Sequence, residues 1–492
     1  MLINRILKTA LILACTNIPC LGLAAESLIG ARPNIVFVIT DDQGMGDLSC
    51  MGNQILQTPN IDTFYQQSTR FTDYQVSPTC APTRAAIMSG RPPFKVGVTH
   101  TILQRERMAL DVFTLPQALK SAGYTTGLFG KWHLGDEEAY LPQNRGFDEV
   151  LMHGAGGIGQ RKYGDFQPNG RNPYFDNVLL HNNTIVQTKG FCTDVFFHAG
   201  LAWIKQQEAT GTPYFAYISL NAPHAPFIAP ESYKQRFLDE GYDQKTAARY
   251  GMIENIDDNF GLLMQKLSEW GALENTLIIF TTDNGMDMRP ITKNGQRLKP
   301  FNAGMKGSKN SAYEGGTHVP AFWYWKGHTS EALDIDVLTT HLDLYPTFVE
   351  LTGVKLPKEM QPLDGRSLLP LLNNPESPWP DRELFIHRGR WKADQRSADQ
   401  YKNFAVRSER WRFVNDTELY DIDEDPEETV NLATAHPEVV SHLRKAFEQW
   451  WNSALPLMIN EGLPEAHAHP LQIRYTQQLK ALGIPTWAPD EL

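Results

Sequence analysis

The chain has little of three things: cysteine, clustered basic residues and long uninterrupted apolar runs. Among its 492 residues are only five cysteines, and the 45 lysines and arginines are outnumbered by 56 aspartates and glutamates, for a net charge of −11. An acidic chain without a dense basic run lacks the bulk electrostatics of a nucleic-acid-binding protein. Any anionic ligand must therefore be held by a local basic pocket. The lack of a long apolar run predicts no integral membrane span.

Residues 1–25 differ in character from the rest of the chain. Arg5 and Lys8 precede a short, broken apolar run that ends in small residues, a pattern typical of a cleaved signal peptide. We therefore predict an exported protein, periplasmic or secreted. A lipoprotein anchor at Cys15 is less favoured, because Leu13 stands where such sites usually carry a small residue.

Removing that segment leaves an odd number of cysteines, Cys50, Cys80 and Cys192. One disulfide plus one special thiol would account for three cysteines, and so would three free thiols. The sequence leaves open whether Cys50 and Cys192 pair.

Short apolar runs that end abruptly in polar residues are the main fold signal. Runs rich in β-branched and aromatic residues suit strands that are buried on both faces, and capped helical patterns such as the one from Thr114 to Gly123 lie between them. This alternation predicts an α/β fold with a large doubly wound, mostly parallel sheet flanked by helices. The runs and the polar residues that follow them are NIVFVIT with Asp41 and Asp42, TLIIFTT with Asp283 and Asn284, PYFAYISL with His224, and YTTGLFG with Lys131 and His133.

These polar residues are predicted to meet at one edge of the sheet. Ligands of doubly wound sheets bind beyond the carboxyl ends of the strands, so clusters far apart in sequence can converge there. Aspartate and asparagine offer oxygen ligands, which select Ca²⁺ or Mg²⁺ rather than zinc. A divalent cation among lysines and histidines makes a pocket for a tetrahedral oxyanion such as sulfate or phosphate. Each cluster alone has a plainer interpretation as a helix cap or turn.

Cys80 stands just before a predicted helix, PTRAAIMS. A helix amino terminus presents free N–H groups and favours bound negative charge, so this cysteine lies where an anion would be attacked. Most free cysteines are simply small buried residues. Arg84 argues against that interpretation here, because a buried arginine needs an anionic partner.

The segment CAPTRAAIMSGR resembles the signature of the type I sulfatases, which depend on formylglycine and belong to the alkaline phosphatase superfamily. Further blocks similar to that family follow one another in order: NIVFVITDDQGMGDLSCMGN, GYTTGLFGKWHLG, NAPHAPF, IIFTTDNG and KNSAYEGGTHVPAFW. The resemblance is to exported bacterial polysaccharide sulfatases. Thr83 departs from the serine that is commoner at its position, but the core Cys-x-Pro-x-Arg is intact.

The resemblance implies a role for each matching residue. Asp41, Asp42, Asp283 and Asn284 match metal ligands, together with Cys80 once an enzyme has converted it to formylglycine; the metal is Ca²⁺, with Mg²⁺ as the alternative. Arg84 matches the residue that steadies the formylglycine hydrate, and Lys131 and Lys309 match lysines that neutralise sulfate oxygens. Lys309 is preferred over Lys306 because of its spacing to Glu314. His224 resembles the acid that protonates the leaving alcohol, and His133 the base that expels sulfate. A formylglycine-generating or anaerobic sulfatase-maturating enzyme is the implied partner.

The predicted organisation is a signal peptide (1–25), a catalytic domain (30–372), a smaller C-terminal α+β subdomain with an antiparallel sheet (380–455), and an irregular tail (456–492). The predicted activity is hydrolysis of sulfate esters on a sulfated poly- or oligosaccharide. Weaker candidates for substrate contact are His153, Arg388 and Arg390. The alternatives are a phosphate or phosphonate ester hydrolase of the same superfamily, and a catalytically inactive glycan-binding protein.

Overall fold

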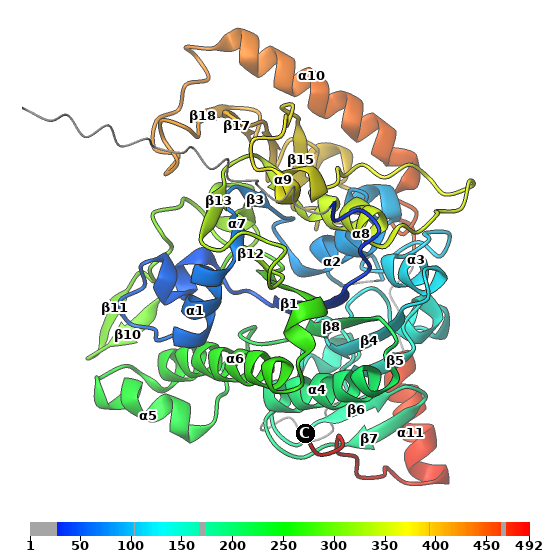
Figure 1. Ribbon diagram of the computed structural model, residues 1–492. Helices are drawn as coiled ribbons and strands as arrows, with labels where there is room; N and C mark the ends of the chain where they lie inside the picture. The colour runs from blue at the N-terminus through cyan, green and yellow to red at the C-terminus, as the bar shows by residue number, and fades with distance from the viewer. Residues whose placement is uncertain (1–26, 103, 167–172, 393, 464–468) are drawn as a thin grey trace, which may run out of the picture.

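A ten-stranded mixed sheet forms the centre of the protein, in a computed structural model that describes residues 27–102, 104–166, 173–392, 394–463 and 469–492 (Figure 1). Its strands are β1 (Asn34–Thr40), β2 (Thr69–Phe71), β4 (Thr125–Gly130), β5 (Glu149–Met152), β6 (Val178–His181), β7 (Thr184–Gln187), β8 (Tyr214–Ser219), β9 (Thr276–Thr282), β12 (Ala321–Tyr324) and β13 (Leu333–Ile335). They follow the order β13-β2-β12-β9-β1-β8-β4-β5-β6-β7. The central strands β9, β1, β8, β4 and β5 run parallel, and antiparallel strands adjoin them on both sides. The predicted fold class is confirmed.

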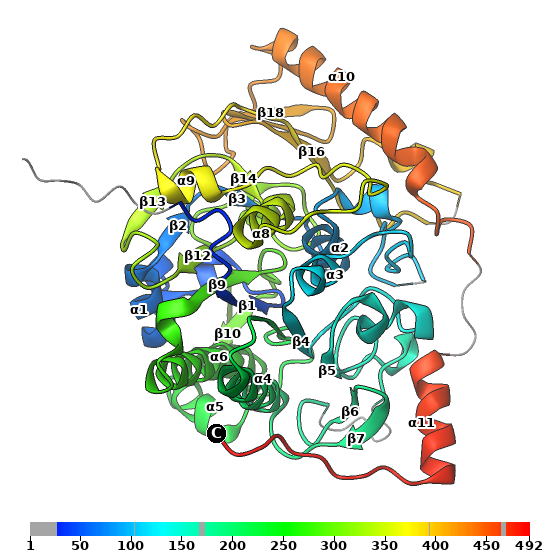
Figure 2. The ribbon, with the colours of Figure 1, turned by 45° about the vertical axis from the view of Figure 1, so that its right-hand side comes forward.

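Helices cover both faces of this sheet (Figure 2). Strand β1 is buried along its whole length: Ile35, Phe37 and Ile39 belong to one hydrophobic core, and Val36 and Val38 to the other. Alternation along a strand sends successive side chains to opposite faces, so a run that is apolar throughout needs a layer on each side. The first layer contains α2 (Cys80–Ser89), α3 (Leu115–Ser121), α8 (Leu344–Thr352) and α9 (Leu369–Asn373), and the second contains α1 (Pro59–Gln67), α4 (Cys192–Thr210) and α6 (Gln244–Glu269), with α5 (Glu231–Asp239) packed on α6.

Local signals in the sequence place several helix ends correctly. Helix α3 begins with the expected capping box, in which the side chains of Thr114 and Gln117 each accept a hydrogen bond from the other residue's backbone N–H. Helix α1 begins at Pro59 as predicted, although the Thr58 hydroxyl bonds Asp62 instead of capping the helix backbone. Helix α2 begins at Cys80 itself.

A second, four-stranded antiparallel sheet lies in the C-terminal part. It contains β15 (Leu384–His387), β16 (Phe404–Arg407), β17 (Trp411–Val414) and β18 (Glu418–Asp421), and α10 (Pro437–Ala454) packs against it. Phe94, from the N-terminal part of the chain, enters the aromatic core between this sheet and α10. The smaller elements are β3 (Tyr74–Gln75), β10 (Ile291–Lys293), β11 (Gln296–Leu298), α7 (Glu314–Thr317) and β14 (Thr339–Thr340). The proposed domain boundaries stay predictions.

The expectation of an irregular tail is wrong. Residues 470–481 form a helix, α11 (Pro470–Ala481), with Pro470 in its first turn. Leu471 is buried in the core on one face of the large sheet, and Tyr475 packs against the same core. Beyond the helix, the backbone of Thr486 pairs with Gln187 of β7. Within residues 469–492, the helix is held because Leu471 and Tyr475 pack on the core of the large sheet.

The cysteines and the N-terminal segment complete the comparison with the sequence. Cys50, Cys80 and Cys192 are all free thiols, which decides the open question of pairing. The predicted signal peptide and the lipoprotein site at Cys15 lie outside the described residues.

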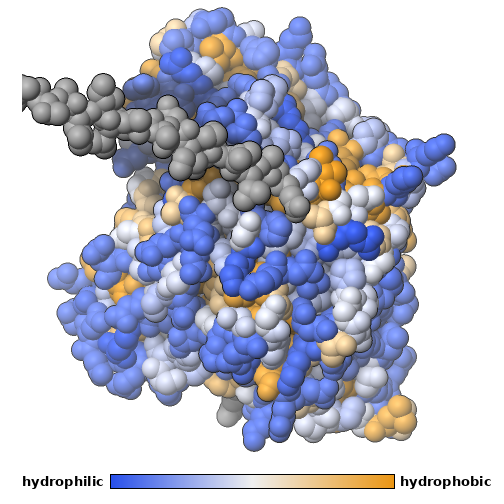
Figure 3. Space-filling view, in the orientation of Figure 1, coloured by the Kyte–Doolittle hydropathy of each residue, from blue (hydrophilic) through white to orange (hydrophobic). Residues whose placement is uncertain are grey.

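Over the ranges that the structure describes, no helix is both long and apolar enough to cross a membrane. The face seen in Figure 3 is mostly hydrophilic, with scattered hydrophobic patches.

A buried ionic cluster joins the C-terminal sheet to the catalytic part. Glu314, in α7, accepts hydrogen bonds from Arg407 at the end of β16 and from Arg412 in β17, and all three side chains are at most 2% exposed. Arg412 also donates to the carbonyl of Ala312 at 2.6 Å. Through these contacts the C-terminal sheet holds in place the loop that carries Lys309.

Replacing Arg412 by methionine should destabilise the protein by about 3–5 kcal/mol, because it leaves the buried Glu314 carboxylate with one cation fewer. Urea unfolding would measure the loss. The matched control is Lys326→Met, whose ion pair with Glu274 is exposed at both ends, with side chains 52% and 64% accessible, and which should leave the urea midpoint almost unchanged. Equal losses from the two substitutions would contradict the anchoring role of Arg412.

Candidate active site

The four strands with polar ends are neighbours in the middle of the sheet. β9, β1, β8 and β4 are adjacent and parallel, so their carboxyl ends open on the same edge. Gly130 ends β4 with a φ of 121°, and a Cβ there would lie 1.9 Å from the carbonyl oxygen of Ser219. Only glycine lets β4 approach β8 this closely just before Lys131. The structure thus brings together residues that are more than 240 positions apart, such as Asp42 and Asn284.

Three carboxylates and an amide gather at this edge, all nearly inaccessible to solvent. Asp283 accepts a hydrogen bond from the backbone N–H of Asp42 at 3.3 Å, and the Asn284 amide donates to the Asp42 carboxylate at 2.9 Å. Carboxylate oxygens of Asp41 and Asp283 and the Cys80 sulfur lie within 4.8 Å of one another. So many buried acids require positive charge among them.

The donor set fits a hard divalent cation. One oxygen of Asp41 and the side-chain oxygen of Asn284 are buried without a hydrogen-bond partner, and both belong to the predicted ligand set. Burial and the nearby Asp283 raise the pKa of Asp41 well above its ordinary value, which a bound cation would reverse. Oxygen donors of this kind suit Ca²⁺ or Mg²⁺.

Gln43 was not singled out from the sequence. It is buried directly after Asp42, and neither atom of its side-chain amide has a partner. Its place at the end of β1, next to two aspartates, was a usable signal.

Each buried acid has its own cation. Lys131 donates to Asp41 at 2.7 Å, and Lys309 to Asp42 at 2.6 Å. Arg84 donates through two nitrogens to one oxygen of Asp283, at 2.8 and 3.0 Å. Each of the three predicted basic side chains therefore forms an ion pair with one of the three aspartates predicted as metal ligands.

The pKa values follow from this pairing. Burial opposes ionisation of Asp42, but Lys309 and His224 lower its pKa below the ordinary value. Burial likewise disfavours the charged form of Lys309 and of Arg84, yet Asp42 raises the pKa of Lys309 and Asp283 that of Arg84. Lys309 and Arg84 therefore stay charged and can face an anion.

Cys80 is the first residue of α2, and all ten residues of that helix are buried. The side chain points toward the acidic cluster, as its distance to Asp41 and Asp283 shows. Arg84 lies one turn further along α2, and its guanidinium also donates to the carbonyl of Lys131 at 3.3 Å. The helix thus places the thiol and the arginine at the same pocket.

His133 is held in one tautomer by its surroundings. Its Nε2 donates to the carbonyl oxygen of Thr101 at 2.8 Å, so the lone pair is on Nδ1, which is buried without a partner. Burial and then Lys131 lower the pKa of His133 well below the ordinary value. A Cβ on Gly156 would lie 2.3 Å from Nε2, so the glycine-rich segment after β5 packs directly on the ring. A neutral, unpaired Nδ1 is suited to accept a proton.

His224 lies near the carboxylate of Asp42. Its Nε2 is 3.8 Å from the Asp42 carboxylate, and its Nδ1 donates to the carbonyl of Ala225 at 2.6 Å. Burial and then Lys309 lower its pKa well below the ordinary value. An anionic substrate beside it would favour the protonated form and so prepare an acid.

His153 and the two C-terminal arginines fall nearby but outside this network. His153 is buried, its Nδ1 bonds the carbonyl of Gly154 and its Nε2 is unpaired; burial lowers its pKa to about 3, with smaller effects of Lys131 and Arg84. Arg388 and Arg390 follow β15 and are partly exposed. Their contacts with substrate stay predictions.

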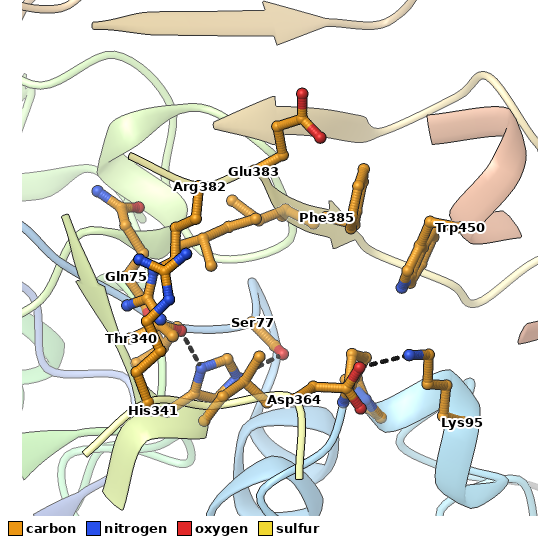
Figure 4. A pocket seen from close by; sticks show the side chains of 17 residues that line it. Gln75, Ser77, Lys95, Thr340, His341, Asp364, Arg382, Glu383, Phe385 and Trp450 are labelled. Atoms are coloured by element: carbon orange, nitrogen blue, oxygen red, sulfur yellow. Dashed lines mark hydrogen bonds and ion pairs between the residues drawn. The ribbon is translucent and has the colours of Figure 1, made fainter. Parts of the chain in front are cut away.

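Two cavities lie away from the acidic cluster. One, of about 160 Å³, opens beside Thr101 and Gly156 and is lined by Glu106 and Asp136, whose pKa values burial raises to about 7 and about 8. The other, of about 280 Å³, lies between the β3–β14 strand pair and β15 of the C-terminal sheet, where His341 and Ser77 are hydrogen-bonded and Trp450 is one of the lining residues (Figure 4). None of the predicted catalytic residues lines the second cavity.

Comparison with known proteins agrees with this site. A family model described as Sulfatase matches residues 33–354, and one described as N-sulphoglucosamine sulphohydrolase, C-terminal, matches residues 308–452. The chain is 31% identical to human arylsulfatase A over 470 residues, covering 86% of this chain and 89% of that protein. It is 29% identical to the N-acetylgalactosamine-6-sulfatase of Rattus norvegicus over 481 residues, covering 92% and 84%.

Among solved structures, the crystal structure of Ps i-CgsB is similar with a TM-score of 0.74 at 27% identity, covering 92% of this chain and 98% of that one. The same protein has been crystallised with k-i-k-neocarrahexaose. A buried acidic cluster paired with basic side chains, beside a cysteine at a helix start on a doubly wound sheet, fits an enzyme that hydrolyses esters of an oxyanion such as sulfate. The chain belongs to the sulfatase family and is a sulfuric ester hydrolase. That family generally uses a metal ion and formylglycine.

Proposed function

We propose that this protein removes sulfate from a sulfated poly- or oligosaccharide, with Cys80 converted to formylglycine and a calcium ion held by Asp41, Asp42, Asp283 and Asn284. The observation that carries the proposal is the approach of Cys80 to Asp41 and Asp283, within 4.8 Å, at the end of the central strands. The saccharide is supported by the relatives: one is named for N-acetylgalactosamine sulfate, and the similar Ps i-CgsB has been seen with a carrageenan-type hexaose. The signal-peptide pattern of residues 1–25 supports export to the periplasm or medium.

Two groups would have to be supplied to the chain. A maturating enzyme would provide the oxidation that turns the Cys80 thiol into an aldehyde. When hydrated, that aldehyde supplies two hydroxyls, one to attack sulfur and one kept for release of sulfate, so the water equivalent is already in place. The cation, when bound, offsets the negative charge of the carboxylates and of the sulfate oxygens.

The chain's own cations bind and orient the ester. Lys131 and Lys309, which stay close to Asp41 and Asp42, direct their ammonium groups at sulfate oxygens. Arg84, fixed by two hydrogen bonds to Asp283, holds the side chain at position 80 in a single orientation. Because these groups are already paired and buried, they need little reorganisation when substrate enters.

The two histidines divide the proton transfers. His224, partly open to the pocket, donates a proton to the leaving alcohol. His133 accepts a proton at Nδ1, the nitrogen left free by the hydrogen bond to Thr101. That bond fixes the ring so that the acceptor nitrogen stays in place.

Matched substrates test the proposal. The enzyme should hydrolyse an aryl sulfate and leave the corresponding aryl phosphate almost untouched, and it should desulfate defined sulfated oligosaccharides. Preferred cleavage of the phosphate would support the phosphoester-hydrolase alternative instead. Binding of sulfated glycans without any turnover, by protein whose Cys80 carries the aldehyde, would contradict the proposed function.

A further inference from the structure

The segment after β15 extends from the C-terminal sheet to two loops beside the active site, which contain Thr99 and Asn310. The backbone N–H of Arg390 donates to the carbonyl of Thr99 at 2.9 Å. A Cβ on Gly389 would lie 2.1 Å from that same oxygen, so the two backbones are in direct contact. Thr99 is two residues before Thr101, the residue that orients His133. The segment therefore lies beside the loop that holds the proposed base.

The same segment touches the loop of the proposed sulfate-binding lysine. Arg390 donates a hydrogen bond to the side-chain oxygen of Asn310, the residue after Lys309. Asn310 in turn donates its backbone N–H to the carbonyl of Pro78 at 2.9 Å, two residues before Cys80. Through Asn310, Arg390 is therefore linked both to the loop that carries Lys309 and to the segment just before α2.

Two arginines in this segment lack an anionic partner. Among the described residues, no carboxylate lies within ion-pair distance of Arg388 or Arg390, although the neighbouring Arg105 pairs with Glu461 at 2.9 Å. Asp399 is near Arg388 but pairs with Lys402 at 2.7 Å. The Nε of Arg388 is buried and unbonded. Burial and the nearby Arg390 both disfavour the charge of Arg388, so an anion bound between these side chains would be stabilised by them.

His100 adds a third donor of the same kind. Its Nδ1 accepts the backbone N–H groups of Thr101 and Ile102, at 2.8 and 3.1 Å, so its proton is on Nε2. No hydrogen-bond partner for that nitrogen is found in the part of the chain that the structure describes. Burial and then Arg390, Arg105 and Arg388 lower the pKa of His100 to about 3, so the ring is neutral and cannot itself offset the arginines.

We propose that Arg388, Arg390 and His100 form a second anion-binding subsite next to the sulfate pocket. It takes a carboxylate or a second sulfate on the saccharide, so the preferred substrate carries another anionic group close to the ester that is cleaved. The planar guanidinium groups suit either oxyanion because each can donate two parallel hydrogen bonds. This subsite rests on the proposed function and narrows its substrate class.

The test uses four substrates: an aryl sulfate, a neutral disaccharide with one sulfate, the same disaccharide with a second sulfate, and a disaccharide with one sulfate and a uronic acid. The wild-type enzyme should show a KM about 10- to 100-fold lower for a doubly anionic disaccharide than for the singly sulfated one, as expected for charge-assisted hydrogen bonds. The last two substrates distinguish a sulfate from a carboxylate as the second anion.

Arg388→Gln and Arg390→Gln, singly and together, should remove that preference. For Arg388→Gln, kcat and the activity on aryl sulfate should stay at the wild-type level. Arg390→Gln also loses its hydrogen bond to Asn310, beside Lys309, so its effect is judged by the ratio of KM values for the doubly and the singly anionic disaccharide. Arg388→Gln alone keeps the test valid if the double variant folds poorly, because within the described part of the chain the Arg388 side chain makes no hydrogen bond that the substitution would remove. Lys392→Gln is the matched control: it removes one charge from an exposed position in the same segment and should change nothing.

The outcomes separate the two proposals. A wild-type enzyme that cleaves all four substrates without preference, or variants that lose activity equally on all of them, would overturn the subsite but leave the sulfatase function intact. A wild-type enzyme with the aldehyde at Cys80 that cleaves none of them would overturn the proposed function itself.

Discussion

Cys80→Ala should abolish sulfate hydrolysis, with kcat lower by about 10⁴-fold or more, because the substitution removes the proposed nucleophile. The fold should survive, since the change deletes one sulfur atom at the first position of α2 and should cost about 1 kcal/mol. Activity assays and thermal unfolding measure the two effects. Mass spectrometry of the wild-type peptide should find an aldehyde at position 80.

Cys192 is a matched control within the same chain. It is also a free, buried thiol at the first position of a helix, α4, but among the described residues it belongs to no group of acidic side chains close enough to share a metal ion. Cys192→Ala should keep full activity, and the Cys192 peptide should retain its thiol. Full activity of protein whose Cys80 is still a thiol would contradict the proposed mechanism.

Asp283→Asn should lower kcat/KM by about 10³-fold or more and also reduce stability. The side chain keeps its shape but loses the charge that pairs with Arg84, leaving a buried guanidinium without its carboxylate at a cost of about 3–5 kcal/mol. It also loses one of the proposed metal ligands. For the wild type, a chelator should lower the Tm and stop turnover, and added Ca²⁺ should restore both, because a ligand that binds only the folded state stabilises it.

The response to the chelator separates a metal ligand from an ordinary buried acid. In Asp283→Asn the chelator should shift the Tm little, since the site is already impaired. Asp343→Asn breaks another aspartate–arginine pair, between the fully buried Asp343 and the mostly buried Arg382, away from the strand ends. That variant should be less stable but should keep the wild-type shift on chelation. An unchanged Tm and undiminished activity of metal-free wild-type protein would contradict the cation site.

The sequence by itself determined the catalytic half of the fold. Apolar runs such as Asn34–Thr40 can be satisfied only inside a sheet covered on both faces, and the polar residues after them must then lie at its carboxyl edge. The capping box at Thr114 and the proline at position 59 marked helix starts because they act within a few residues. These patterns are local, so they can be read along the chain.

Only the tertiary structure decided which distant groups meet. The hydrogen bond from His133 to Thr101, the unpaired amide of Gln43 and the anchoring of Glu314 by Arg412 each depend on packing, and no spacing rule encodes them. The irregular tail was predicted wrongly because α11 gains its order from a surface formed by the core of the large sheet. Likewise, the sequence offered Arg388 and Arg390 only as weaker candidates for substrate contact. The fold strengthens that candidacy because it sets them beside the active-site loops and, among the described residues, puts no carboxylate within ion-pair distance of them; long-range contacts of that kind are fixed by how whole elements pack.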